Sequence, residues 1–142
     1  MIDFLDAIAE HLEAEGVGTR ATSIFVNKQP ADIDECITLH GRPGPTTGAQ
    51  RDVAELQQPR FQVIVRSSDY NDASDLFQSV RTALHNKINL LLPAGVDIEA
   101  EPFIRVMRMH AEQEGGPIGE DDQGRSEFSI NFIAQYHHYE PA

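Results

Sequence analysis

One stretch in the middle of the chain changes its hydrophobic period, and this change constrains the fold more than any other feature. In residues 60–66, apolar and polar side chains alternate and place Phe61, Val63 and Val65 on one face, which predicts a strand with one buried face. In residues 70–86, apolar side chains recur three or four positions apart instead, as they do along one face of a helix. A strand that leads directly into an amphipathic helix indicates a fold that mixes both elements.

The same two patterns recur along the rest of the chain. A helix is predicted for residues 2–15, where Leu5, Ile8 and Leu12 form an apolar stripe and Gly16 follows. Further strands are predicted for residues 23–26, 35–40, 88–92, 103–109 and 126–136. The alternative for residues 88–92 is a continuation of the preceding helix. Because strands that are joined by short turns pair antiparallel most easily, we predict an α+β fold with a mostly antiparallel sheet of four to six strands and two main helices packed on it.

Two stretches are rich in residues that interrupt regular structure. Residues 41–59 contain repeated glycines and prolines, and residues 111–125 combine glycines with acids. We therefore predict a single domain, residues 1–142, with long loops at about 41–59 and 111–125. A loop as long as the first usually binds a partner. Residues 137–142 are predicted to be a loose tail.

The charge and cysteine content argue against nucleic-acid-binding, membrane-surface and disulfide-stabilised proteins. The chain has 23 acids against 11 bases and a formal net charge of −12, which argues against ordinary nucleic-acid binding and against an anionic membrane surface. One cysteine cannot form an intramolecular disulfide. The N-terminal residues lack the features of a signal peptide, and no apolar run approaches the roughly 20 residues that span a bilayer. These features predict a soluble, cytoplasmic protein.

The sequence contains no pattern that indicates a catalytic, metal or cofactor site. The glycines of residues 115–119 lack the ending of a phosphate-binding loop, and the nearby acids lack the alternation of a calcium loop. The six histidines have no zinc-ligand spacing. Cys36 lies in a predicted strand, where cysteines are usually buried and inert, and residues 67–69 are typical of a helix cap. We predict no catalytic residue, no metal and no cofactor.

Several phrases of the sequence occur in an order found in one group of proteins. They are the N-terminal MIDFLDAIAEHLEAEGVGT, the strand at 24–26, QPRFQVIVR at 58–66, the helix that opens at Asp69 and Tyr70, and residues 117–119, 121–125 and 128–132. This arrangement resembles phage minor capsid proteins of the tail-terminator family. The resemblance spans most of the chain, and the chain departs from it in its longer 41–59 loop and its acidic 115–124 loop.

The resemblance implies a structural role in a virion. Such proteins form a ring, commonly a hexameric one, at the head-proximal end of the tail, after they are made in the host cytoplasm. The ring stops growth of the tail tube and joins it to the head–tail connector protein. The implied partners are further copies of the chain, the tail tube protein and the connector. Neither a membrane nor a catalytic residue is implied.

A ring suggests how the charges of this chain are used. Six copies would carry six times −12, or −72 formal charges, so DNA would pass through the lumen without specific binding. A ring also needs two different complementary surfaces on each copy. We predict that Arg42 and Arg51 reach carboxylates of a neighbouring copy at Glu120, Asp121 and Asp122. The alternative is a 41–59 loop that is simply mobile.

Three other functions compete with this interpretation. A head–tail connector or tail-completion protein would differ in copy number and neighbours. An acidic binding module outside a virion, such as a DNA mimic, requires carboxylates along one rigid face, whereas here they divide between a helix and a predicted loop. A small enzyme requires a pocket with a perturbed ionisable pair, and no residues of the sequence nominate one.

Overall fold

The computed structural model describes residues 3–42 and 56–140, which form two helices and a seven-stranded sheet. In chain order the elements are α1 (Phe4–Ala14), β1 (Ile24–Val26), β2 (Cys36–Arg42), β3 (Arg60–Ser67), α2 (Tyr70–Leu84), β4 (Lys87–Leu92), β5 (Phe103–Ala111), β6 (Gly116–Glu120) and β7 (Ser126–Tyr139).

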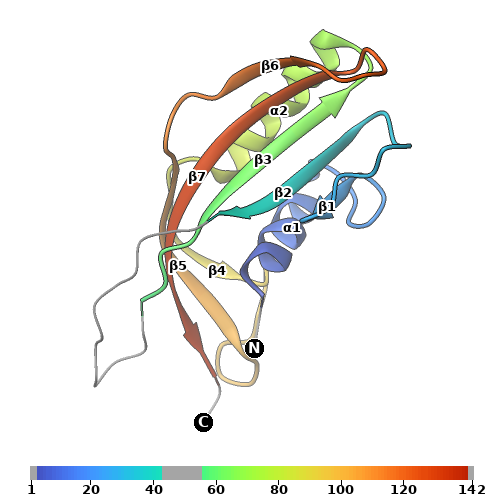
Figure 1. Cartoon of the computed structure of the whole chain (residues 1–142). Helices are drawn as coiled ribbons and strands as arrows, with labels where there is room; N and C mark the ends of the chain where they lie inside the picture. The colour runs from blue at the N-terminus through green and yellow to red at the C-terminus, as the bar shows by residue number, and fades with distance from the viewer. Residues whose placement is uncertain (1–2, 43–55, 141–142) are drawn as a thin grey trace.

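The sheet is mostly antiparallel, and its strands follow the order β1-β2-β3-β7-β5-β4, while β6 pairs with β7 beside this path (Figure 1). The α+β class and the mostly antiparallel pairing are therefore confirmed. The predicted size of four to six strands is wrong, because a seventh strand, β6, is present. The first two strands also differ from expectation, since β1 and β2 pair parallel.

Local signals explain where the two helices begin and end. Asp3 caps α1, and its carboxylate accepts a hydrogen bond from the Asp6 amide at 3.1 Å. After α1 the chain turns at Gly16, whose φ of +78° suits glycine. Asp69 precedes α2 as expected, but its side chain makes no cap hydrogen bond.

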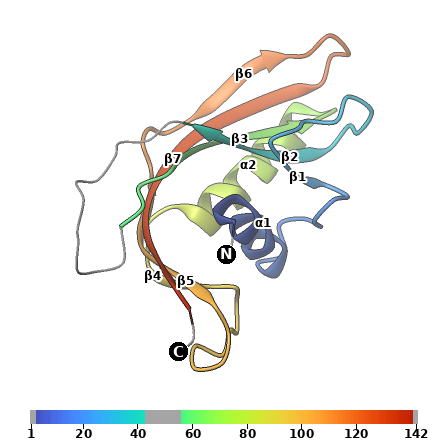
Figure 2. The ribbon, with the colours of Figure 1, turned by 60° about the horizontal axis from the view of Figure 1, so that its bottom comes forward.

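One apolar core lies between the sheet and the two helices. Figure 2 shows the sheet bending around α1 and α2, which lie on the same side of it. The predicted stripes supply this core, since Ile8 and Leu12 of α1 are fully buried among strand residues. Phe61 of β3 meets Phe4 of α1 at a ring distance of 5.7 Å and Phe132 of β7 at 5.3 Å. Sequences that are distant along the chain thus form one core.

Strand β6 corrects the expected loop at 111–125. Gly116–Glu120 pairs antiparallel with the first residues of β7, with a register shift between Pro117 and Gly119. Gly115 has a φ of +74°, and a Cβ there would lie 2.7 Å from the Ser129 carbonyl oxygen, so glycine allows the chain to approach β7. The composition that predicted a loop therefore serves an irregular strand.

The other boundaries depart less from expectation. Strand β2 continues to Arg42 and β3 begins at Arg60, so both ends of the predicted 41–59 loop are ordered strand, while residues 43–55 lie outside the described residues. Strand β7 continues to Tyr139, which corrects the predicted loose tail at its first residues. The extension pairs with β5, and the Tyr139 ring stacks on Phe103 at 4.9 Å.

Candidate assembly surfaces

Acidic residues gather at one end of the sheet, in two segments that are far apart in sequence. The first segment is residues 31–35, which precede β2, and the second is residues 120–125, which join β6 to β7. We call these two segments the acidic tip. Its exposed acids are Asp32, Asp34, Glu35, Glu120 and Asp122. Two buried arginines, Arg66 and Arg125, fix the positions of these segments.

Arg66, near the end of β3, binds the backbone of the first segment and of the residue before it. Its side chain is buried, and its guanidinium donates hydrogen bonds to the backbone carbonyls of Pro30 and Ile33. Carbonyls that accept from a charged donor are held more strongly than those that accept from a neutral donor. The path of residues 30–33 is therefore determined by a side chain of the sheet.

Arg125 joins the two segments to each other. Its guanidinium donates to the Ala31 carbonyl at 2.9 Å and lies 3.4 Å from the Asp34 carboxylate. Its Nε donates to the Asp121 carboxylate at 2.7 Å. Desolvation alone would raise the pKa of Asp121, but hydrogen bonds from the Arg125 backbone and side chain and from the Gln123 amide outweigh it and hold that pKa below its usual value. Asp121 thus shapes the turn.

The structure separates the residues that the sequence nominated for contacts between copies. Glu120 and Asp122 are exposed at the acidic tip. Arg42 is at the opposite end of β2 and lies 4.0 Å from the Glu112 carboxylate, which also pairs with Arg60 at 2.8 Å. Arg51 lies outside the described residues.

Sequence reasoning missed Arg66 and Arg125, the residues that build the acidic tip. The spacing of Asp121 and Arg125, four residues apart across a turn, was an available signal. The contact from Arg125 to Ala31 joins positions 94 apart in the sequence, and hydrophobic periodicity carries no signal for such a contact. An arginine at the buried end of β3 was a second clue, because buried guanidinium groups require partners.

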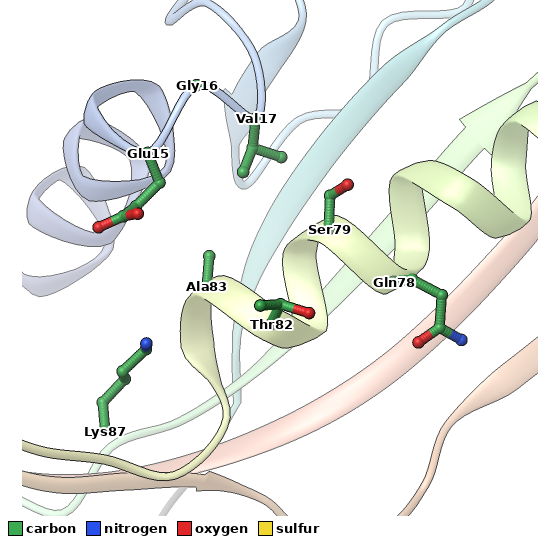
Figure 3. Close-up of a pocket in the computed structure, with 8 residues that line it drawn as sticks. All are labelled: Glu15, Gly16, Val17, Gln78, Ser79, Thr82, Ala83 and Lys87. Atoms are coloured by element: carbon green, nitrogen blue, oxygen red, sulfur yellow. The ribbon is translucent and has the colours of Figure 1, made fainter.

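A groove with a volume of about 450 Å³ lies between the two helices. Figure 3 shows the end of α1 facing α2 across it, with Lys87 at one side. Its ionisable lining residues are Glu15 and Lys87, and the Ser79 hydroxyl donates to the Asp75 carbonyl of its own helix at 3.1 Å. The Ser79 hydroxyl is thus bonded to its own helix and not to a neighbouring base that would activate it.

Among residues 3–42 and 56–140, the potential metal ligands are scattered and the cysteine thiol is buried. No group of three or more His, Cys, Asp and Glu residues there is arranged to hold a metal ion. Burial raises the pKa of the Cys36 thiol, although the nearby Arg66 charge partly opposes this shift, so the thiolate that would act as a nucleophile is disfavoured. In the same ranges, no helix has the length and apolar character needed to cross a membrane.

Comparison with known proteins agrees with the fold and identifies the family. A solved structure described as "Virion of native gene transfer agent (GTA) particle" contains a chain with a TM-score of 0.61 and 14% identity, and the match covers 94% of each chain. No curated protein sequence matches. The family model described as "Bacteriophage tail terminator protein" matches residues 11–138. The chain therefore belongs to the bacteriophage tail terminator family and is a structural protein of the virion.

Proposed function

We propose that this protein forms a ring at the head-proximal end of a phage tail, where it ends growth of the tail tube and joins the tube to the head–tail connector. The family match over residues 11–138 carries this proposal. The ring acts by assembly and has no catalytic role. A six-fold ring of this acidic chain would present mostly negative charge, so DNA would pass without adhering to the lumen.

The copy number of the protein in purified virions tests the ring. Quantitative mass spectrometry would compare this chain with the major tail and portal proteins of the same particle. A value of about six per particle is the expected result for a closed ring at the end of the tube. About twelve would favour a connector adaptor, and hundreds would indicate a tube subunit. Complete absence from the virion would overturn the proposal and favour an acidic binding module.

We further propose that contacts between copies pair opposite charges at different places on the chain. Arg42 and Arg51 of one copy would face Glu120 and Asp122 of the next. Such head-to-tail contacts form a ring when the rotation between copies closes on itself. Asp121 would contribute through the turn that it forms with Arg125, because its carboxylate is already bonded there.

Charge reversal tests this pairing. The double variant R42E/R51E should reduce the amount of protein in virions at least tenfold while the free protein unfolds at an unchanged temperature. K28E is the matched control, because Lys28 is exposed and forms no ion pair among the described residues. Normal incorporation of the double variant would exclude these arginines from the contact and would leave the ring itself untouched.

A further inference from the structure

A groove at the start of β4, away from the acidic tip, combines exposed apolar side chains with bases. It has a volume of about 310 Å³ and lies where β4 begins beside β5. Its lining includes Ile88 and Met107, whose exposed fractions are 77% and 42%, together with Lys87, Arg108 and His110. Exposed apolar side chains that are rimmed by polar groups are typical of a surface that binds another protein.

The bases of this groove are notable on a chain that has 23 acids and only 11 lysines and arginines. In the part of the chain that the structure describes, Lys87 and Arg108 take part in no ion pair. By contrast, Arg60 and Arg42 on the same sheet lie beside Glu112. The groove therefore keeps a local positive charge on an acidic protein, and the partner that fits it is acidic and partly apolar.

The hairpin of β6 and β7 has the complementary character. Ile118 is 57% exposed in β6, and the exposed acids Glu120 and Asp122 follow it. Strand β6 is also an edge of the sheet, but Pro117 lacks an amide hydrogen and Gly119 has a φ of +118°. Because these residues oppose pairing with a further strand, the hairpin presents its side chains rather than its backbone.

The hairpin and the groove cannot meet within one molecule. Strand β6 pairs with the first part of β7, whereas β5 pairs with the last part, from Phe132 to Tyr139. Figure 2 shows β6 and the β4–β5 pair at opposite ends of the curved sheet. Two complementary surfaces that lie apart on one chain produce a head-to-tail contact between copies, as a ring requires.

We propose that the groove at β4 and β5 receives the β6–β7 hairpin of a second copy, with Ile118 against Ile88 and Met107, and with Glu120 and Asp122 near Lys87 and Arg108. This inference rests on the proposed ring and names the surfaces that join its subunits. Arg42 lies on the same face of the sheet, because the cross-strand row Arg42, Arg60, Ile133 and His110 joins four neighbouring strands. A neighbour that docks at the groove therefore approaches from the same side of the sheet as Arg42.

A pair of introduced cysteines tests this contact in the assembled particle. Virions would be made with the full chain carrying I88C and I118C, and then oxidised mildly. Cys36 is buried and does not compete. We expect covalent ladders at multiples of the 15.8 kDa chain under non-reducing conditions, whereas I88C alone and I118C alone should remain at the size of one chain. The ladder requires both positions because each disulfide joins two different surfaces.

The outcomes separate the docking surface from the ring. Particles that contain about six copies but give no ladder would overturn the hairpin contact and leave the ring standing. Particles that contain no copy of the unmodified chain would overturn both. A further outcome is a double variant that unfolds at the normal temperature but does not enter particles. In that case, addition of reducing agent during assembly should restore its incorporation. Failure of this rescue would also count against the contact.

A charge exchange provides a second, independent test. R108E and E120K should each lower incorporation into particles at least tenfold. A mixture of the two variants should restore incorporation, because an alternating ring pairs the reversed groove with the reversed hairpin and the native groove with the native hairpin. No restoration in the mixture would contradict the proposal. Normal incorporation of R108E with altered DNA release would instead assign the groove to DNA.

Discussion

The middle of the sheet and the acidic tip are stabilised by different forces. In the middle, rings from α1, β3 and β7 pack at centroid distances of 4.7 to 5.7 Å, and their side chains are buried from water. At the tip, few apolar groups are available, and Arg66 and Arg125 hold the chain through its backbone carbonyls. The middle is stabilised chiefly by burial of apolar area, and the tip by charged hydrogen bonds.

This difference assigns separate roles to the two regions. A core of close-packed rings determines whether the chain folds at all. A tip that is fixed by hydrogen bonds keeps its exposed acids in a constant arrangement, which reduces the entropy lost when a partner binds. Changes in the core should therefore alter global stability, and changes at the tip should alter local order and assembly.

The largest effect is expected from F61A, in the middle of the sheet. Phe61 is fully buried between Phe4 and Phe132, and truncation of a core phenylalanine costs about 3–5 kcal/mol. Urea unfolding would measure this loss. The matched control is I64A, on the same strand but on the opposite face and only half-buried, with an expected cost of about 1 kcal/mol. Equal costs for both variants would contradict an asymmetric core.

A smaller, more local effect is expected from R66A. The variant removes the donor that binds the Pro30 and Ile33 carbonyls, and a hydrogen bond from a charged group contributes about 1.5–3 kcal/mol. Hydrogen exchange should accelerate in residues 30–35 before it does so in β3. The exposed Lys28 again supplies the control, since K28A should change stability by less than about 0.5 kcal/mol. Uniform acceleration across the sheet would show that the tip and core unfold together.

Particular elements show how far the sequence predicts this fold. Strand β3 and helix α2 follow directly from periods of two and 3.6, because each buries one continuous face. Strand β6 was missed because Gly116, Pro117 and Gly119 are typical of loops, and its pairing depends on contact with β7. The parallel pairing of β1 with β2 depends on how residues 27–35 fold back, and that path is held by distant arginines.

The candidate surfaces were less predictable than the fold. The acids Glu120 and Asp122 are visible as charge in the sequence, and the structure leaves them exposed. Asp34 joins this group through its contact with Arg125, a residue that is 91 positions away in the sequence. The groove at Ile88 and Met107 was missed because an apolar residue in a strand is ordinarily assigned to the core. Only pairing between strands shows which face remains open.

Two glycines, one before β6 and one in the turn between β6 and β7, test how tightly this hairpin is packed. Gly115 and Gly124 have similar φ values, +74° and +75°. A Cβ at Gly115 would lie 2.7 Å from the Ser129 carbonyl oxygen, whereas a Cβ at Gly124 would have no atom within 4 Å. Both alanine variants incur backbone strain of about 1 kcal/mol. G115A should cost roughly 1 kcal/mol more than G124A because of overpacking, as measured by thermal unfolding. Equal losses would show that β6 shifts freely away from β7.

The smallest effect concerns the pH dependence of the tip. The Asp121 pKa is lower in the folded chain than in the unfolded chain because hydrogen bonds from Arg125 and Gln123 outweigh desolvation. A carboxyl group with a depressed folded pKa stabilises the fold above its unfolded pKa, and this stabilisation is lost as pH falls through the folded pKa. Stability should therefore decline in acid, with the earliest gain in hydrogen exchange at residues 120–125.

The variant D121N separates this group from the other 22 acids of the chain. An asparagine keeps the shape and can still accept hydrogen bonds, but it does not titrate. D121N should be slightly less stable than the parent at neutral pH, and the two should converge as the pH falls below the Asp121 pKa. A stability difference between D121N and the parent that stays constant across this pH range would mean that Asp121 shapes the turn without its charge. The tip would then resemble the core, because both would depend on uncharged contacts.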